Sequence, residues 1–145
     1  MDNWSEEEHE IAGDYSETLQ GLVENSRPHI MNLTQLARDY GKKFGHVIVE
    51  MIKLRIFKCQ DEHKLPALYL VDSIIKNHGN PYNALFSRDR VVNKMFVHVF
   101  SRVKEKTREA LFKLRGTWTP LFPNELLYAL DMDVKRIGKF ISKWK

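Results

Sequence analysis

Residues 65–78 read Leu-Pro-Ala-Leu-Tyr-Leu-Val-Asp-Ser-Ile-Ile-Lys-Asn-His, and this stretch decides the fold. On a helical wheel one side is apolar, and the other is polar around an aromatic ring. A helix this apolar suits the centre of an all-helical domain, where its polar side would line a groove. The wheel alone leaves an ordinary solvent face as the alternative. The apolar side holds Ala67, Leu68, Val71, Ile74, Ile75 and His78, and the polar side holds Tyr69, Asp72, Ser73, Lys76 and Asn77.

Helical signals continue on both sides of this stretch. Period-two alternation and hairpin turns are missing, and seven glycines are spread over the whole chain. Ser5 and Glu8 have capping-box spacing, and Gly79 suits a left-handed helix end. We therefore expect an all-α domain, most simply a right-handed superhelix of about eight paired helices. The expected helices cover residues 5–23, 28–41, 42–59, 66–79, 82–86, 91–103, 107–115 and 124–130.

The end of the chain has its own pattern. After Asp131 and Asp133, which we expect to cap a last helix, apolar residues recur at helical spacing with lysine and arginine between them. We expect residues 1–131 to form the domain and residues 132–145 to form a basic amphipathic helix or extension. This extension could pack back on the domain, touch RNA or lead into a downstream segment. Its apolar residues are Val134, Ile137, Phe140, Ile141 and Trp144.

Composition narrows the class of protein. The chain has 145 residues, of which 43% are hydrophobic and 29% charged, so it is not a disordered tail. No apolar run approaches the roughly 20 residues of a membrane span, and the acidic start does not read as a signal peptide. The single cysteine, Cys59, excludes an internal disulfide framework. We expect the cytosol or the nucleus.

Charge is unevenly spread along the chain. Residues 1–25 carry eight acids and no Lys or Arg, whereas residues 26–145 carry 23 bases and 11 acids. A basic body of this kind suits a polyanionic or phosphorylated partner. The alternative is that both blocks are merely solvated helix faces.

Signs of catalysis are missing. The six histidines show no metal-ligating spacing, and there is no phosphate-cradling glycine loop or nucleophile motif. We expect no enzyme activity, no cofactor and no metal.

Short motifs, in order along residues 8–131, resemble a known family. They include Asn25-Ser26-Arg27-Pro28, Tyr69-Leu70-x-Asp72-Ser73-Ile74-x-Lys76-Asn77, Leu111-Phe112-Lys113-Leu114-Arg115 and Thr117-Trp118. Each motif alone is weak evidence for a family, but the motifs together, in this order, are specific. The chain resembles the CTD-interacting domain (CID) family, in the form found in pre-mRNA cleavage factor II. The resemblance implies a right-handed superhelix of eight helices, of the architecture that VHS and ENTH domains share.

The resemblance also implies a ligand. CIDs bind the Tyr-Ser-Pro-Thr-Ser-Pro-Ser heptads that form the C-terminal tail of the RNA polymerase II largest subunit, preferably phosphorylated at the second-position serine. An Asp matching Asp72 accepts the hydroxyl of the heptad tyrosine, and an Asn matching Asn77 bonds peptide backbone. The turn at Asn25, Ser26 and Arg27 lies at the other end of the groove. The remaining implied peptide-binding positions are Tyr69, Ser73, Lys76, Ala110 and Leu114.

One position departs from the family pattern. Several relatives place an arginine that grips the serine phosphate where this chain has Ala110. Lys106 and Lys113 share the side of the helix on which Ala110 lies, whereas Arg108 is about 200° away. We expect weak phosphate attraction from these two lysines, without bidentate geometry.

The implied role couples elongating polymerase to pre-mRNA 3′-end cleavage, polyadenylation and transcription termination in the nucleus. Other 3′-end processing factors would be partners of a longer chain, and the domain is expected to be monomeric, without membrane binding. Two alternatives stay open: a membrane-trafficking adaptor of VHS or ENTH type, and a weak RNA-binding module.

Overall fold

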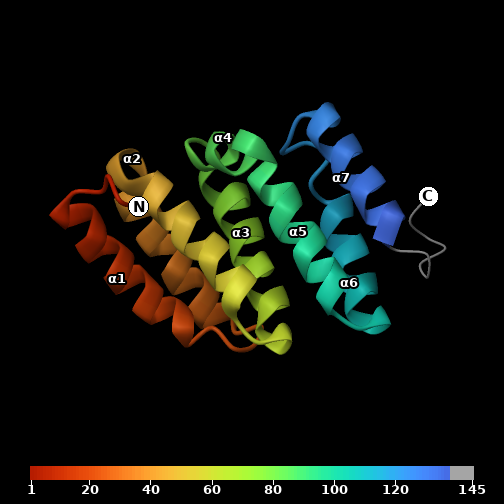
Figure 1. Ribbon diagram of the computed structural model, residues 1–145, viewed down its shortest axis with the longest axis horizontal. Helices are drawn as coiled ribbons and strands as arrows, with labels where there is room; N and C mark the ends of the chain where they lie inside the picture. The colour runs from red at the N-terminus through yellow and green to blue at the C-terminus, as the bar shows by residue number, and fades with distance from the viewer. Residues whose placement is uncertain (138–145) are drawn as a thin grey trace.

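The computed structural model describes residues 1–137 of the chain, and within them it holds helices and no strand. The long helices pack side by side, with α1 at one end of the molecule and α6 and α7 at the other (Figure 1). The expected all-α superhelix is confirmed. The elements are α1 (Glu6–Gln20), α2 (Arg27–Lys58), η1 (Asp61–His63), α3 (Lys64–His78), α4 (Tyr82–Ser87), η2 (Arg88–Arg90), α5 (Val91–Arg102), α6 (Glu105–Gly116) and α7 (Asn124–Ile137).

The first helix begins as its sequence predicts. The Ser5 hydroxyl accepts from the Glu8 amide at 3.1 Å, and the Glu8 carboxylate accepts from the Ser5 amide at 2.8 Å. This capping box satisfies two amides that would otherwise lack intrahelical partners. The Glu8 carboxylate also meets His46 of α2, and these hydrogen bonds lower the pKa of Glu8.

The second helix does not end at Gly41, where the sequence predicts a break. The two helices expected over residues 28–41 and 42–59 form one element, which kinks at Phe44 (φ −122°, ψ 17°). Glycine suits this segment because α4 packs closely on the kink. A Cβ on Gly45 would lie 2.9 Å from Leu85 Cδ1, and a Cβ on Gly41 would lie 3.2 Å from Tyr82 Cε2. Gly41 thus serves close packing rather than helix termination.

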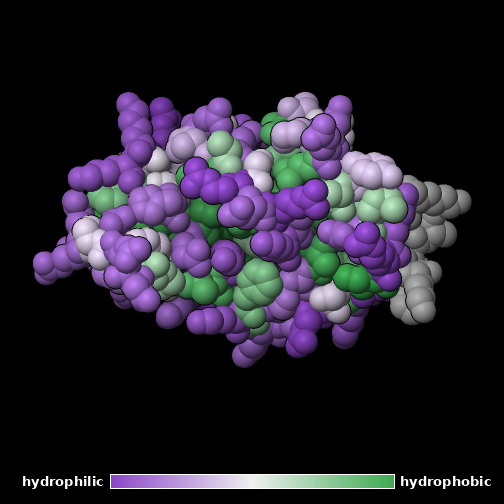
Figure 2. All heavy atoms as spheres, turned by 45° about the horizontal axis from the view of Figure 1, so that its top comes forward, coloured by the Kyte–Doolittle hydropathy of each residue, from purple (hydrophilic) through white to green (hydrophobic). Residues whose placement is uncertain are grey.

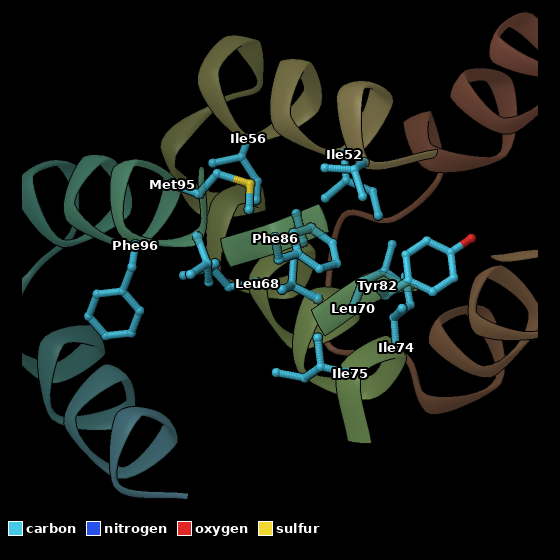
Figure 3. Close-up of a cluster of buried hydrophobic side chains, with 14 of the residues drawn as sticks. Ile52, Ile56, Leu68, Leu70, Ile74, Ile75, Tyr82, Phe86, Met95 and Phe96 are labelled. Carbon is cyan, nitrogen blue, oxygen red and sulfur yellow. The ribbon is translucent and has the colours of Figure 1, made fainter. Parts of the chain in front are cut away.

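Helix α3 lies at the centre of the molecule, as expected for its apolar side. Its apolar side chains meet those of α2, α4 and α5 in one cluster (Figure 3). The ring of His78, on the same side, bonds the Thr34 carbonyl of α2 at 2.8 Å. Gly79 ends the helix with φ 63°, the left-handed conformation that favours glycine. The labelled members of the cluster are Ile52, Ile56, Leu68, Leu70, Ile74, Ile75, Tyr82, Phe86, Met95 and Phe96.

The last helix also differs from expectation. Helix α7 continues from Asn124 through Asp131 and Asp133 to Ile137, so neither aspartate caps a helix. Asp131 instead accepts two hydrogen bonds from Arg115 of α6, at 2.9 and 2.8 Å. This bidentate pair ties α6 to α7. The rest of the expected basic helix, residues 138–145, lies outside the described residues.

Hydrophobic side chains reach the surface in small separate areas on the face seen in Figure 2. The large hydrophobic side chains that are exposed come from different parts of the chain, and this face shows no broad apolar seam. Among the described residues they are Met1, Val23, Met31, Phe57 and Tyr128.

Candidate functional site

A hollow of about 490 Å³ lies between α3 and α6, and we call it the groove. Helix α3 contributes Tyr69 and Lys76, which are seven residues and hence two turns apart. Helix α6 contributes one face, whose members recur at three- and four-residue spacing. The residues that line the groove from α6 and its end are Lys106, Glu109, Ala110, Lys113, Leu114 and Thr117.

Asp72 lies between Tyr69 and Lys76 on α3 and is held by two donors. The fully buried Trp118 donates its indole hydrogen to Asp72 Oδ1 at 2.8 Å, and Lys76 Nζ lies 2.7 Å from the same oxygen. The Asp72 side chain is 17% exposed. Within residues 1–137 no hydrogen bond involves Asp72 Oδ2. The carboxylate is therefore fixed through one oxygen, and the other can accept a hydrogen bond from a ligand.

Lys76 also joins the two walls of the groove. Its ammonium donates to the Thr117 hydroxyl at 2.9 Å, and that hydroxyl donates to the Leu114 carbonyl at 2.7 Å. The end of α6 is thereby tied to α3 beside Asp72. Such a network holds a binding site in one geometry before a ligand arrives.

Tyr69 stands where the groove meets a second hollow. Burial raises the pKa of the Tyr69 phenol, and the nearby Asp72 charge raises it further, so the ring carries a neutral hydroxyl. The second hollow, of about 280 Å³, runs from Tyr69 past Leu65, Pro66 and Thr107 to Asn25. We call it the Asn25 hollow. Together the two hollows make an elongated depression with apolar surface and scattered polar groups.

The charges of the groove are mainly cationic. Lys106 and Lys113 are exposed and make no ion pair within the described part of the chain, while Glu109 lies on the same face between them. Ala110 faces the groove, as expected, and supplies only a methyl group. Arg108 faces away, because its Nε donates to the Phe100 carbonyl at 2.9 Å and its guanidinium lies over the Phe100 ring.

Five of the expected site residues line neither hollow. One of them is Asp72, which lies on α3 between the lining residues Tyr69 and Lys76 and is 17% exposed. The Ser73 hydroxyl contacts the Thr34 hydroxyl at 2.7 Å and so joins α3 to α2. Asn77 is exposed and donates to the Ser73 carbonyl at 2.8 Å. Ser26 caps α2 by accepting from the His29 amide, and Arg27 is exposed at the first position of that helix. The structure thus brings Tyr69, Lys76, Lys106, Ala110, Lys113 and Leu114 to one groove, and Asn25 to its extension.

Sequence reasoning missed the groove residues Glu109 and Thr117 and the contact between Trp118 and Asp72. A signal for this contact was available, because a buried tryptophan needs an acceptor for its N–H group. The wheel of a single helix carries no such information, since Trp118 and Asp72 are far apart in the sequence.

Among residues 1–137, no group of three or more His, Cys, Asp or Glu side chains could bind a metal ion. No helix among residues 1–137 is both long enough and apolar enough to cross a bilayer.

The chain matches a protein-family model and is similar to curated proteins. The family model described as CID domain matches residues 14–130. The chain is 42% identical over 130 residues to the Polyadenylation and cleavage factor homolog 11 of Caenorhabditis elegans, covering 87% of this chain and 15% of that protein. It is 36% identical over 135 residues to Protein PCF11 of Saccharomyces cerevisiae, covering 92% of this chain and 21% of that protein.

A solved structure agrees with both. The crystal structure of the rpr of pcf11 matches with a TM-score of 0.79 and 32% identity, covering 86% of this chain and 98% of that one. The chain therefore spans about a fifth or less of the length of these two curated relatives and nearly all of the solved domain.

Proposed function

Because this chain belongs to the CID domain family, we propose that its groove binds the heptad-repeat C-terminal tail of the RNA polymerase II largest subunit. The observation that carries the proposal is the position of Asp72 on α3, between Tyr69 and Lys76, which both line the groove. Trp118 and Lys76 fix one carboxylate oxygen, and the other is left for a ligand hydroxyl. The heptad tyrosine offers such a hydroxyl on an apolar ring.

The rest of the depression suits an extended proline-rich peptide. Tyr69, Leu114 and the Ala110 methyl group offer apolar contact to a tyrosine or proline ring. Beyond Tyr69, the Asn25 hollow continues this surface with Leu65 and Pro66. Asn77, whose side-chain oxygen makes no hydrogen bond within residues 1–137, can accept from peptide backbone. We assign the peptide a path from the α6 end of the groove toward Asn25.

Phosphate on the second-position serine strengthens binding modestly in this proposal. Lys106 and Lys113 supply positive charge, and Glu109 between them weakens it. Exposed lysines act as point charges without the fork of an arginine, and salt screens them. The preference for the phosphorylated peptide is therefore smaller than an arginine at position 110 would give.

The cellular role follows the relatives. We propose that the whole protein works in the nucleus, where this domain couples elongating polymerase to pre-mRNA 3′-end cleavage, polyadenylation and transcription termination. Other 3′-end processing factors would contact parts of the protein outside this chain. Many repeats in one polymerase tail raise the effective affinity of a weakly binding domain.

Fluorescence anisotropy with labelled two-repeat peptides tests the proposal. We expect saturable binding of the unmodified peptide, tighter binding with phosphate on the second-position serine, and a smaller gain with phosphate on the fifth-position serine. Anionic vesicles and single-stranded RNA serve as competitors for the two alternative functions. A folded domain that binds vesicles or RNA but none of the peptides would contradict the proposal.

A further inference from the structure

A larger hollow lies outside the groove, where the end of α2 meets α5 and α7. It measures about 560 Å³, and we call it the α5 hollow. Phe57 comes from α2 and Asp133 from α7, whereas the rest of the lining follows one face of α5 and its start. Nothing in the proposed function uses this hollow.

The charge of the α5 hollow is cationic. Arg90 and Lys94 are exposed and make no ion pair or hydrogen bond with any described residue. Asp133, the acid in the lining, is paired with Arg136 at 2.8 Å. The lining therefore carries two cations and one acid that is already paired, and an anionic group is the complementary ligand.

The floor of the α5 hollow combines apolar surface with unsatisfied polar atoms. Phe57 is 39% exposed and lies against the His98 ring, with ring centroids 4.5 Å apart. Asn93 is only 2% exposed, and its amide donates to the Leu126 carbonyl at 3.0 Å. Asn93 Oδ1 and His98 Nε2 are buried and have no hydrogen-bond partner. Buried polar atoms are ordinarily paired, so Asn93 Oδ1 points to a missing donor and His98 Nε2 to a missing donor or acceptor, according to its tautomer.

The backbone at the start of α5 is also unusual. Asp89 (φ 52°) and Arg90 (φ 55°) both adopt the left-handed conformation, which non-glycine residues rarely take. Two such residues in succession set Arg90 at the mouth of the α5 hollow, ahead of the first turn of α5.

One more hollow reaches from the Asn25 hollow to the end of α5. This rim hollow lies between η1 and the α5–α6 link and shares Asp61, Glu62, Val103 and Thr107 with the Asn25 hollow. Arg102 also lines it and pairs with Asp61 at 3.2 Å. Arg102 lies one turn of α5 after His98, which lines the α5 hollow, so the rim hollow ends close in sequence to the α5 hollow.

We propose that the α5 hollow is a second docking site for a further repeat of the same phosphorylated tail. This inference rests on the proposed function. The tyrosine ring of that repeat would pack on Phe57, its phosphate would lie near Arg90 and Lys94, and a peptide N–H would donate to Asn93. A peptide of several repeats is long enough, because each extended heptad adds about 23 Å and a domain of this size has a radius of gyration of about 15 Å.

Binding to peptides of different length tests the second site. The domain carries the label, and its concentration is held well below the dissociation constant. The peptide is then titrated in excess, so that each peptide binds at most one domain. Two-repeat and five-repeat peptides, phosphorylated on every second-position serine, are compared. A five-repeat peptide offers four overlapping two-repeat registers, and this alone raises its affinity about fourfold over the two-repeat peptide. For the wild-type domain, a second site should raise the affinity for the five-repeat peptide by at least about a further tenfold.

The variant Arg90→Ala/Lys94→Ala should bind the two-repeat peptide like wild type and lose the further tenfold. Phe57→Ala should reduce the same length advantage without removing charge. The matched control Lys42→Ala/Lys43→Ala removes two exposed cations of α2 that line none of these hollows, and should leave both affinities unchanged. Circular dichroism confirms that each variant is folded.

A length advantage that survives in Arg90→Ala/Lys94→Ala and in Phe57→Ala would overturn the second site alone. Wild type that fails to bind the two-repeat peptide would overturn the proposed function and, with it, this inference.

Discussion

The indole N–H of Trp118 donates to Asp72 Oδ1 across 2.8 Å, joining the second residue after α6 to the middle of α3. Trp118 is fully buried, and Asp72 lies between Tyr69 and Lys76, which line the groove. The contact therefore links the stability of the domain to the shape of its site, and removing it should affect both.

Replacing Trp118 with Phe keeps an aromatic ring in the core and deletes the donor. We expect a loss of about 1–3 kcal/mol in unfolding free energy, because a partly buried carboxylate loses a charge-assisted hydrogen bond and the core loses volume. Chemical denaturation measures this loss. Trp4→Phe, at a residue that is only partly buried, is the control, and equal stability of the two variants would contradict the assigned role.

Two of the glycines in helices, Gly45 and Gly13, give opposite predictions for alanine. At Gly45 a Cβ would lie 2.9 Å from Leu85, whereas at Gly13 in α1 it would meet nothing within 4 Å. We expect Gly45→Ala to destabilise the domain by about 1–3 kcal/mol through overpacking. Gly13→Ala should stabilise it by about 0.5–1 kcal/mol through helix propensity. Thermal unfolding of both variants checks the sign, and stabilisation by Gly45→Ala would show that α4 does not pack on the kink as described.

Much of the fold was open to prediction from local pattern. The apolar side of residues 65–78 gave α3 its central place, and Ser5 with Glu8 marked the start of α1. The kink position was missed because Gly41 serves tertiary packing against Tyr82, which no local rule reveals. The helix boundary expected near Asp131 was wrong for a similar reason. This aspartate forms an ion pair with Arg115 of another helix and does not cap its own helix.

The site was only partly open to prediction. The spacing of Ala110, Lys106 and Lys113 placed them correctly on one face, because helical geometry fixes that relation. Thr117 lines the groove and the buried Trp118 bonds Asp72, and both contacts with α3 depend on how two helices distant in sequence pack. Ser73 illustrates the converse: its position on the polar side was right, but its hydroxyl contacts α2 instead of lining the groove.

Phosphate preference should respond to charge on α6. In Lys113→Glu we expect the ratio of phosphorylated to unmodified affinity to fall, with little change for the unmodified peptide. In Ala110→Arg we expect that ratio to rise about fivefold, since a new charge-assisted hydrogen bond at an accessible site is worth about 1 kcal/mol. Thr119→Arg, which adds the same charge at an exposed position outside the groove, should leave the ratio unchanged.

The outcome that would count against these lysines is a ratio that stays at the wild-type value in Lys113→Glu. A ratio of phosphorylated to unmodified affinity that rises strongly in 0.5 M salt would also contradict a role for the lysines, because salt screening weakens exposed charge pairs.

His98 gives a prediction for pH. Burial lowers the pKa of His98 from its ordinary value of 6.5, and the charges of Lys64 and Arg102 lower it further. Between that folded pKa and 6.5 the unfolded chain binds more protons than the folded domain. The contribution of His98 to stability is therefore full above pH 6.5 and is lost as the pH falls toward the folded pKa.

His98→Phe keeps a ring beside Phe57 and removes the titration. The stability difference between wild type and this variant should shift against wild type as the pH is lowered from 7 to 5, and NMR of the His98 ring should give a midpoint below 6.5. A midpoint above 6.5 would mean that the ring is not held in the neutral form.

The central claim is that the polymerase tail binds between α3 and α6, with Asp72 as acceptor. The most direct measurement is an NMR titration of the labelled domain with the phosphorylated two-repeat peptide, for wild type and for Asp72→Asn, which keeps an acceptor for Trp118. We predict that the amides around Tyr69, Lys76 and Ala110 shift most in wild type, and that Asp72→Asn weakens binding about tenfold while its spectrum shows an intact fold. Large shifts confined to α1 or α7, or equal affinity for the two proteins, would contradict the account.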